Sequence, residues 1–240
     1  HMKEKIAAFV KAKPVKEVKA NPVKGIKEVK KAKLLSELSE ITGIGLAKAK
    51  ELISMGIGSV QQLEEDKYFN TLSIIGKAFV KYKPIDRIGR QTIFEIERAI
   101  GRDDVIFVGS YRRGKPDSGD IDVLVRDLHQ FHSHLVHIFG IDKVVLYSHG
   151  DDKSNFLIKY NGAWLQLDAF KYDDYNKYPM LLYATGSKEN NIRLRAAAKK
   201  KKYLLNQEGL YDEHGNRIPI RSEQDIYEQL GLKYQEPHER

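Results

Sequence analysis

The sequence predicts an α+β fold, with helices grouped at both ends of the chain and a mixed β-sheet in the middle. Apolar residues recur at helical spacing between residues 34 and 100. Between residues 103 and 170 the pattern changes to short apolar strands, and helix and turn signals return from residue 179. Helices and strands that are segregated along the chain in this way are typical of the α+β class.

The first segment is strongly basic, in a chain that carries 41 Lys and Arg against 33 Asp and Glu and has a net charge of +8. Lysines crowd residues 3–33, where only three acidic residues occur. Such a surplus attracts polyanions, of which nucleic acid is the commonest, and a solubilising tail is the alternative. Because Pro14, Pro22 and Gly25 interrupt helices, we expect residues 1–34 to form a flexible basic arm.

Composition also excludes several classes of site and location. The chain has no cysteine, which excludes disulfides and thiolate metal ligands. No apolar run approaches the roughly 20 residues that a membrane-spanning helix needs, and the sequence contains no signal-peptide core. We therefore expect an intracellular protein without a membrane partner.

Residues 35–100 are expected to form a helical subdomain. Within it, a turn containing Gly43 and Gly45 joins two helices, and the second of these ends near Gly56. The backbone N–H groups of this turn, with the helix N-terminus that follows, can hold one DNA phosphate without reading sequence, and Lys48 can add a phosphate contact. An ordinary helical hairpin with a glycine turn is the alternative.

The middle of the chain is expected to supply the sheet. Asn161-Gly162 is a two-residue turn of the kind that joins hairpin strands. Near the C-terminus, Ile218-Pro219-Ile220 is expected to be an edge strand. The predicted strands are 105–108, 121–125, 144–148, 155–160 and 163–170, with an amphipathic helix at 128–139.

Three aspartates on these strands have the pattern of a magnesium site. Successive side chains of a strand point to opposite faces, so Asp120 and Asp122 project together. Two such carboxylates repel each other unless a cation lies between them, and Mg²⁺ prefers hard oxygen ligands that it can share with phosphates. Asp168 is the third carboxylate that a second ion needs. Two ions about 3.5–4 Å apart would hold the attacking and leaving oxygens of an in-line displacement.

A Gly-Ser turn precedes the first two aspartates and has the character of a phosphate site. Gly109 and Ser110 follow a strand, where a turn can present backbone N–H groups to a triphosphate. Arg113 supplies a forked cation for phosphate oxygens, and Ser118 and Gly119 let the backbone approach a ligand closely. The alternative is that the acids are turn caps or surface ion-pair partners, which explains each of them singly but not this combination in this order.

In this order, the motifs resemble those of the family X DNA polymerases, from about Leu35 to Arg240. The segment from Ile41 to Ile57 resembles the helix-hairpin-helix of the family, and Gly109–Leu124 resembles its metal and triphosphate motif. Further segments resemble the nucleotide-binding and closing motifs of the family: Tyr183-Ala184-Thr185-Gly186-Ser187 followed by Asn191 and Arg195, and 222–237.

The resemblance implies a template-directed DNA polymerase that adds a dNMP to a primer 3′-OH by two-metal in-line phosphoryl transfer, filling gaps in DNA repair. Asp120, Asp122 and Asp168 would be the catalytic metal ligands for two Mg²⁺ ions, for which Mn²⁺ can substitute. The expected partners are a dNTP and gapped or primer–template DNA. We expect a monomer that works in the nucleus or another DNA-containing compartment.

The resemblance also implies roles for single residues around the nucleotide and the DNA. Tyr183, with the turn at Gly186, would lie against the sugar and help to exclude ribonucleotides. Asn191 would reach the minor-groove edge of the incoming base, and Arg195 the template strand. The residues implied to bind the dNTP are Gly109, Ser110, Arg113, Ser118, Gly119, Tyr183, Gly186 and Asn191, and those implied to bind DNA are Gly43, Gly45, Lys48 and Arg195.

The implied subdomains follow the composition changes along the chain. A helix-hairpin-helix DNA-binding subdomain would span 35–100, a nucleotidyltransferase palm with the mixed sheet 101–178, and a small α+β nucleotide-selecting subdomain 179–240. The basic arm at 1–34 stands where the family has its lyase domain, so we expect no deoxyribose-phosphate lyase activity.

Several positions depart from the family pattern, and other functions remain open. Ala184 stands where the family usually has an aromatic residue, and Gln166 and Phe170 flank Asp168 where beta-like members carry Arg. We therefore expect unusual fidelity and altered electrostatics at the primer end. A template-independent nucleotidyltransferase is one alternative, against which the short turn at Asn161-Gly162 argues. A non-catalytic DNA-binding protein is the other.

Overall fold

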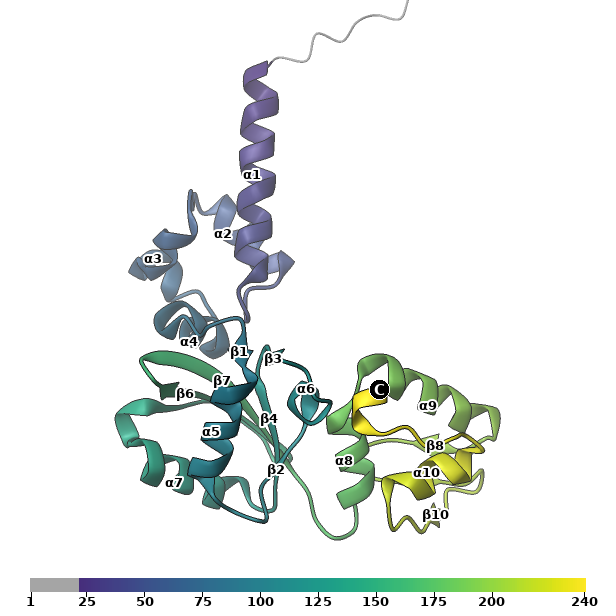
Figure 1. The fold of residues 1–240 in the computed structure, drawn as a ribbon. Coiled ribbons are helices and arrows are strands. Elements are labelled where there is room, and N and C mark those ends of the chain that lie inside the picture. Colours follow the sequence, from purple (N-terminus) through teal and green to yellow (C-terminus); the bar gives the residue numbers. More distant parts are fainter. Residues whose placement is uncertain (1–21) are drawn as a thin grey trace, which may run out of the picture. The chain divides into compact units, whose positions relative to one another are not determined.

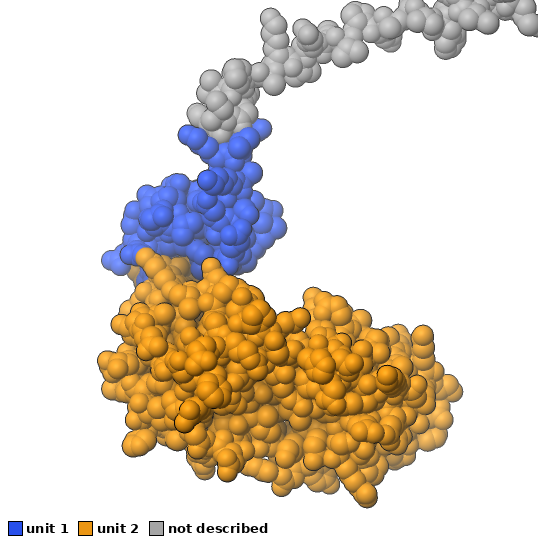
Figure 2. Space-filling view, in the orientation of Figure 1, with its two compact units in different colours: residues 1–69 blue, residues 70–240 orange. Residues whose placement is uncertain are grey.

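The computed structural model describes residues 22–240, with side chains from residue 28 onward. Contacts divide the chain into two compact units, residues 1–69 and residues 70–240, which Figure 2 shows in different colours. The prediction of a basic arm over residues 1–21 lies outside the described residues. Within the described part, no helix combines the length and apolarity that a bilayer span requires.

Within its described residues, 22–69, the first unit is helical. Its elements are α1 (Pro22–Glu40), α2 (Leu46–Ser54), the 3-10 helix η1 (Val60–Glu64) and α3 (Asp66–Phe69). Helices α1 and α2 pack together, and Leu38 and Leu52 are fully buried. The turn between them has Gly43 at φ +86°, a left-handed conformation that favours glycine, and Gly45 is the N-cap of α2. The predicted helical hairpin is therefore present.

Helix α1 corrects the predicted extent of the basic arm. We expected the arm to continue to residue 34, but residues 22–34 belong to one helix that runs on to Glu40. Pro22 is the first residue of this helix, where its missing N–H removes no hydrogen bond. A single Gly25 inside a helix costs only about 1 kcal/mol relative to alanine. Neither residue is therefore sufficient to prevent the helix.

The second unit is built on a five-stranded sheet in the order β2-β4-β7-β6-β5. Strands β4 and β7 are parallel and the other pairs are antiparallel, so the sheet is mixed as predicted. Asn161 and Gly162 both have positive φ in the hairpin turn between β6 and β7. The strands are β2 (Ile106–Phe107), β4 (Ile121–Val125), β5 (Val144–His149), β6 (Lys153–Tyr160) and β7 (Ala163–Lys171).

One face of this sheet forms the main hydrophobic core. Helices α5 (Arg90–Ile100) and α7 (Leu128–Phe139) cover it (Figure 1), and Ile96 and Phe131 pack there against alternate strand residues such as Leu167. On the opposite face, α4 (Ile74–Tyr82) covers part of β5 and β6. Because strand residues alternate between faces, a buried apolar face leaves the intervening side chains for the opposite one.

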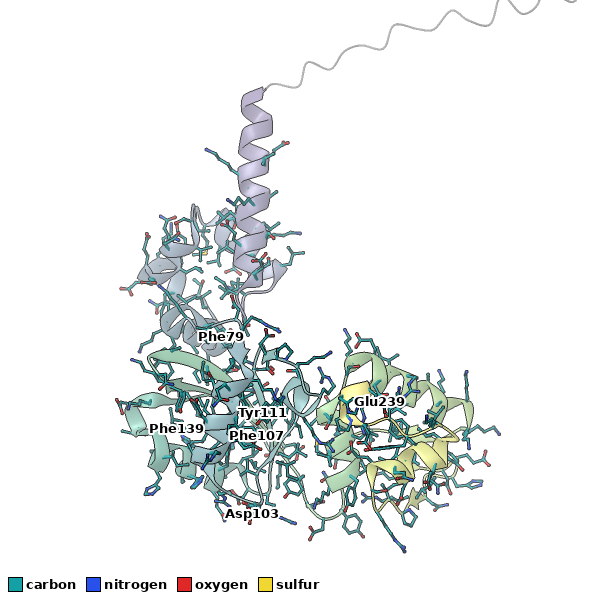
Figure 3. The ribbon with its side chains drawn as sticks, in the orientation of Figure 1. Phe79, Asp103, Phe107, Tyr111, Phe139 and Glu239 are labelled. Atoms are coloured by element: carbon teal, nitrogen blue, oxygen red, sulfur yellow. The ribbon has the colours of Figure 1, made fainter. Side chains whose placement is uncertain are left out.

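A short turn of helix follows β2 at the edge of the sheet. This is α6 (Gly109–Arg112), and the strands β1 (Ile88–Gly89) and β3 (Asp117–Ser118) pair beside it. Tyr111 anchors α6, because its hydroxyl donates a hydrogen bond of 2.6 Å to Glu97 and its ring meets the ring of Phe107 edge-on at 5.9 Å. Figure 3 shows these two aromatic side chains together. The position of α6 is therefore fixed by the main core.

The C-terminal part of this unit is a small α+β layer with its own core. Leu194, Leu210 and Ile226 are fully buried there. Its three-stranded sheet has the order β10-β9-β8, so β10 is an edge strand; it contains Ile218 of the predicted edge strand, but not Pro219 or Ile220. The elements are α8 (Lys177–Thr185), α9 (Lys188–Lys200), β8 (Leu204–Leu205), β9 (Leu210–Tyr211), β10 (Arg217–Ile218) and α10 (Glu223–Leu230), and the 3-10 helices of this unit are η2 (Ile141–Lys143) and η3 (Pro237–Glu239).

Candidate active site

The three predicted aspartates meet on the sheet face opposite α5 and α7. Asp122 on β4 is the direct partner of Asp168 on the parallel strand β7, and Asp120 lies immediately before β4. One carboxylate oxygen from each of the three lies within 4.8 Å of the others. Because Ile121 faces the main core, the alternation of β4 sends both of its acidic neighbours to this face.

The electrostatics of this cluster favour a bound cation. Burial, and then the charges of Asp120 and Asp168, raise the pKa of Asp122 to about 8. Burial, and then the charge of Asp168, also raise the pKa of Asp120. Three hard oxygen donors at such short range form the ligand set that Mg²⁺ takes. A divalent ion between the three acids would offset the mutual repulsion of their carboxylates.

Asp168 is oriented by Gln166 and by two side chains that we did not predict, Asn155 and Lys153. Its Oδ1 accepts hydrogen bonds from Asn155 at 2.7 Å and from Gln166 at 3.2 Å, and its Oδ2 forms an ion pair with Lys153 at 2.7 Å. Asn155 is the cross-strand partner of Asp168 in the hairpin of β6 and β7. The turn at Asn161-Gly162 fixes this register, so counting outward from it could have identified Asn155.

Gly109 allows the Gly109-Ser110 turn, the predicted phosphate site, to lie directly against the three clustered aspartates. Its φ is +60°, and a Cβ added at this position would fall on the carboxylate of Asp122. The backbone N–H of Val108 donates to the carbonyl of Asp122 at 2.9 Å, which fixes the turn to β4. Only glycine combines this backbone conformation with so close an approach.

A pocket of about 500 Å³ opens beside these groups. Phe170, Ala184, Lys188 and Ile192 complete its wall, so two of the positions that depart from the family pattern, Phe170 and Ala184, face it. The predicted residues that line it are Gly109, Ser110, Arg113, Asp120, Asp122, Tyr183, Gly186, Asn191 and Arg195.

Two predicted nucleotide-binding residues, Ser118 and Gly119, are not in the pocket wall. The hydroxyl of Ser118 is buried and accepts a hydrogen bond of 2.6 Å from the hydroxyl of Ser110. Ser118 therefore orients the side chain of Ser110, which does line the pocket. Gly119 lies next to Asp120, and an added Cβ would come 3.8 Å from the backbone oxygen of Asp86.

Arg113 connects the phosphate turn to the C-terminal layer. One of its terminal nitrogens donates to the carbonyl of Thr185 at 2.5 Å, while its buried Nε is without a hydrogen-bond partner among the described residues. Gly186, at φ +72°, lies so close that an added Cβ would be 3.1 Å from the guanidinium, and the Gly186–Ser187 peptide bond is cis. An unsatisfied buried donor beside a pocket is a natural partner for an anionic ligand.

The far wall of the pocket is formed by α8 and α9. The side-chain amide of Asn191 donates to the backbone carbonyl of Tyr183 at 2.9 Å. The guanidinium of Arg195 lies 5.6 Å from the centre of the Tyr183 ring. Tyr183, the residue expected at the sugar, is thus held between two residues expected at the base and the template.

A second group of charged residues, which we also did not predict, joins α6 to the end of the chain. The Glu223 carboxylate accepts hydrogen bonds of 2.6 Å from both Arg112 and Arg240, and Arg112 also donates to the hydroxyl of Thr185 at 2.6 Å. Burial raises the pKa of Glu223, but the two guanidinium groups outweigh it and hold the pKa below its usual value. Glu223 is 6% exposed, so these pairs act with little screening from water.

Comparison with known proteins decides the family. A model described as the DNA polymerase beta palm matches residues 84–149, and one described as the DNA polymerase beta thumb matches residues 180–240. Repair DNA polymerase X of African swine fever virus (isolate Tick/South Africa/Pretoriuskop Pr4/1996) is 31% identical over 144 residues, which are 57% of this chain and 81% of that protein. The chain belongs to the family X DNA polymerases.

Two further known proteins are similar to this chain. DNA polymerase lambda from Arabidopsis thaliana is 27% identical over 253 residues, 88% of this chain, and the chain spans about half (47%) of that protein. The crystal structure of Leishmania infantum polymerase beta in a ternary P/T complex shares the fold, with a TM-score of 0.76, 24% identity and coverage of 88% of this chain and 99% of that one.

The two matched segments of this family X chain hold most of the site. The palm match contains Asp120 and Asp122, and the thumb match contains Tyr183 and Glu223. Asp168 lies between the two matched segments, and the strand pairing of β4 with β7 brings it to the other acids.

The helix-hairpin-helix residues lie in the first unit. Gly43 and Gly45 form the turn as predicted, and the Lys48 ammonium pairs with Glu51 at 2.8 Å. Such an exposed pair is weak, and the phosphate contact of Lys48 stays a prediction.

Proposed function

We propose that this family X member is a template-directed DNA polymerase that adds a dNMP to a primer 3′-OH by two-metal in-line phosphoryl transfer, and that it fills gaps in DNA repair. The observation that carries the proposal is the triad of Asp120, Asp122 and Asp168 within 4.8 Å. The triad adjoins a pocket whose other wall bears Tyr183 and Asn191. A nucleotide in that pocket would have its phosphates beside the acids.

Neighbouring residues hold the carboxylate oxygens of the triad in position. Asn155 and Gln166 keep Oδ1 of Asp168 in a fixed orientation. Gly109 lets the phosphate turn approach Asp122. When bound, a pair of Mg²⁺ ions supplies Lewis-acid activation of the primer hydroxyl and charge stabilisation of the departing pyrophosphate. Asp168 is the group beside the expected primer end that would accept the hydroxyl proton.

The remaining pocket residues select and hold the nucleotide. The unpartnered Nε of Arg113 is a donor for triphosphate oxygens. Ser110, whose hydroxyl donates to Ser118, lies beside it in the pocket wall. Tyr183 is the surface against which the sugar would rest. Asn191 would reach the base edge, and Arg195 the template strand. These roles follow the family pattern, and the shared pocket supports them.

DNA is the proposed partner of both units. The helix-hairpin-helix turn at Gly43 and Gly45 offers backbone N–H groups for one phosphate. A basic chain with a net charge of +8 adds sequence-independent attraction. Gap filling draws its support from the relatives that are named repair polymerases. We further propose that the protein acts as a monomer, in the nucleus or another DNA-containing compartment.

Single-nucleotide incorporation tests the proposal. The substrates are a gapped duplex, an open primer–template and a single strand, each with every template base and each dNTP. We expect incorporation that follows the template, is fastest on the gap and is absent on the single strand. Incorporation that is independent of the template would instead support the template-independent alternative.

An acid-to-alanine pair separates a catalyst from a non-catalytic DNA-binding protein. Asp122→Ala should lower the rate at least about a thousandfold, because it removes a metal ligand and with it several kcal/mol of transition-state stabilisation. Asp142→Ala, which alters an exposed acid of η2, is the matched control and should leave the rate unchanged. An equal rate in both variants would contradict the mechanism.

A further inference from the structure

The ammonium of Lys153 contacts a carboxylate oxygen of Asp168, one of the three clustered aspartates. Its Nζ lies 2.7 Å from Oδ2 of Asp168, whereas the neutral amides of Asn155 and Gln166 occupy Oδ1. The two oxygens of one carboxylate are thus divided between two kinds of donor. Two amides orient the group, and one cation neutralises it.

Lys153 also stabilises the ionised forms of Asp120 and Asp122. Its positive charge opposes the rise in the pKa of Asp120 and of Asp122, which burial and mutual repulsion cause. Arg113 acts in the same sense on Asp122. Lys153 is therefore a cation that contacts Asp168 directly and whose charge also acts on Asp120 and Asp122.

The surroundings of Lys153 allow its ammonium group to move away from Asp168. Its side chain is 40% exposed, while that of Asp168 is 8% exposed. The ammonium also lies 4.7 Å from the centre of the Phe170 ring, a second favourable contact that does not involve the acid. If the ammonium swings away, Asn155 and Gln166 still hold Asp168 through Oδ1. The Asp168 carboxylate would keep its orientation, and its Oδ2 would be free to bind an ion.

We propose that Lys153 is a positioning residue that competes with a divalent cation for Oδ2 of Asp168 and thereby sets the metal affinity of the cluster. This inference rests on the metal-binding role in the proposed function. While no metal ion is bound, Lys153 reduces the electrostatic repulsion among the three acids in the folded protein. It yields Oδ2 to the ion, so the free enzyme binds metal more weakly than the three acids alone would.

The test is a titration of the whole chain with Mn²⁺, with free Mn²⁺ followed by electron paramagnetic resonance and with neither DNA nor nucleotide present. Buffer at about pH 8.5 keeps protons from competing strongly for the acids. The variants are Lys153→Met, which removes the charge, and Lys153→Arg, which keeps it. Lys159→Met is the matched control, since it removes a lysine from the same strand without contact to the acids.

We expect Lys153→Met to bind Mn²⁺ at least about threefold more tightly than the unaltered protein, because a partly buried ion pair is lost and a doubly charged ion gains most from that loss. Lys153→Arg should bind no more tightly than the unaltered protein, and Lys159→Met should match it. A residue with a merely structural role could weaken metal binding on removal but would not strengthen it.

Two outcomes overturn different statements. If Lys153→Met binds Mn²⁺ equally or more weakly while Asp168→Asn abolishes binding, the inference about Lys153 is wrong and the metal role of the triad stands. If Asp168→Asn binds as the unaltered protein does, the metal role itself fails. Circular dichroism identifies any variant that fails to fold, in which case Lys153→Gln replaces Lys153→Met with the same expected direction.

Discussion

Asp122 and Asp168 are direct neighbours in a parallel strand pair, although β5, β6 and α7 lie between them in the sequence. This pairing makes the site, because it joins the acid pair of β4 to an acid on the far side of a hairpin. The same register sends Ile121 and Leu167 together into the main core. A single-residue slip would therefore expose apolar residues and bury acids.

Gly109→Ala should impair catalysis more than folding. The added Cβ would fall on the Asp122 carboxylate, and a φ of +60° is unfavourable for alanine. A displaced metal ligand of this kind costs on the order of 10²-fold in rate. Gly89→Ala, where an added Cβ meets nothing within 4 Å, is the control and should retain its rate. Equal rates in the two variants would contradict the role of this close approach.

Arg113→Gln should weaken nucleotide binding. The variant loses the forked cation whose buried Nε is free to meet a phosphate, so KM for the dNTP should rise about tenfold or more. Steady-state kinetics on a gapped duplex measures the effect. Arg126→Gln removes an exposed ion pair with Asp174 and should leave KM unchanged. An unaltered KM in Arg113→Gln would refute this assignment.

Glu223→Gln should destabilise the protein at neutral pH. Two arginines would lose a buried partner, at a cost of about 3 kcal/mol. Asp174→Asn, which breaks an exposed pair, should cost less than about 1 kcal/mol. Urea denaturation at pH 7 compares them, and a smaller loss in Glu223→Gln than in Asp174→Asn would be inconsistent with this network.

The pH dependence of that loss has a definite sign. The pKa of Glu223 is lowered in the folded protein, because guanidinium groups outweigh the effect of burial. Its stabilisation is therefore present above the unfolded pKa and disappears as pH falls through the lower folded pKa. The free energies of unfolding of Glu223→Gln and of the unaltered protein should converge in strong acid and diverge toward neutrality.

The metal-free protein should become less stable as pH rises from about 4 to about 8. Burial and neighbouring charges raise the pKa of Asp122 to about 8, so its neutral form stabilises the fold and is lost as pH passes that value. Thermal melts in EDTA should follow this trend, and Asp122→Asn should flatten it. With Mg²⁺ the trend should reverse, since an ion binds the deprotonated acids. A melting temperature that rises with pH in EDTA would contradict this prediction.

Much of the palm could be predicted because its signals are local. The alternation in β4 and the apolar periodicity of α7 gave their bounds to the residue, and a two-residue turn located the hairpin. The parallel neighbour of β4 is a long-range choice, so the meeting of Asp122 with Asp168 came from family resemblance and from the need for a third acid.

The residues that escaped prediction are those whose partners are distant. Glu223 is an ordinary first-turn acid of a helix in the sequence, and only the fold brings Arg112 and Arg240 to it. Lys153 resembles any exposed lysine until the hairpin places it over Asp168. For helix α1, Pro22 was interpreted as a breaker, although a proline in the first turn is compatible with a helix.

The most direct test of the whole account is a crystal of the protein with gapped duplex DNA, a non-hydrolysable dNTP and Mn²⁺, measured for anomalous scattering. We predict two Mn²⁺ peaks about 3.5–4 Å apart among the carboxylates of Asp120, Asp122 and Asp168, with Asp168 contacting at least one of them. Peaks that Asp168 does not touch, or their absence between the three acids, would contradict the account.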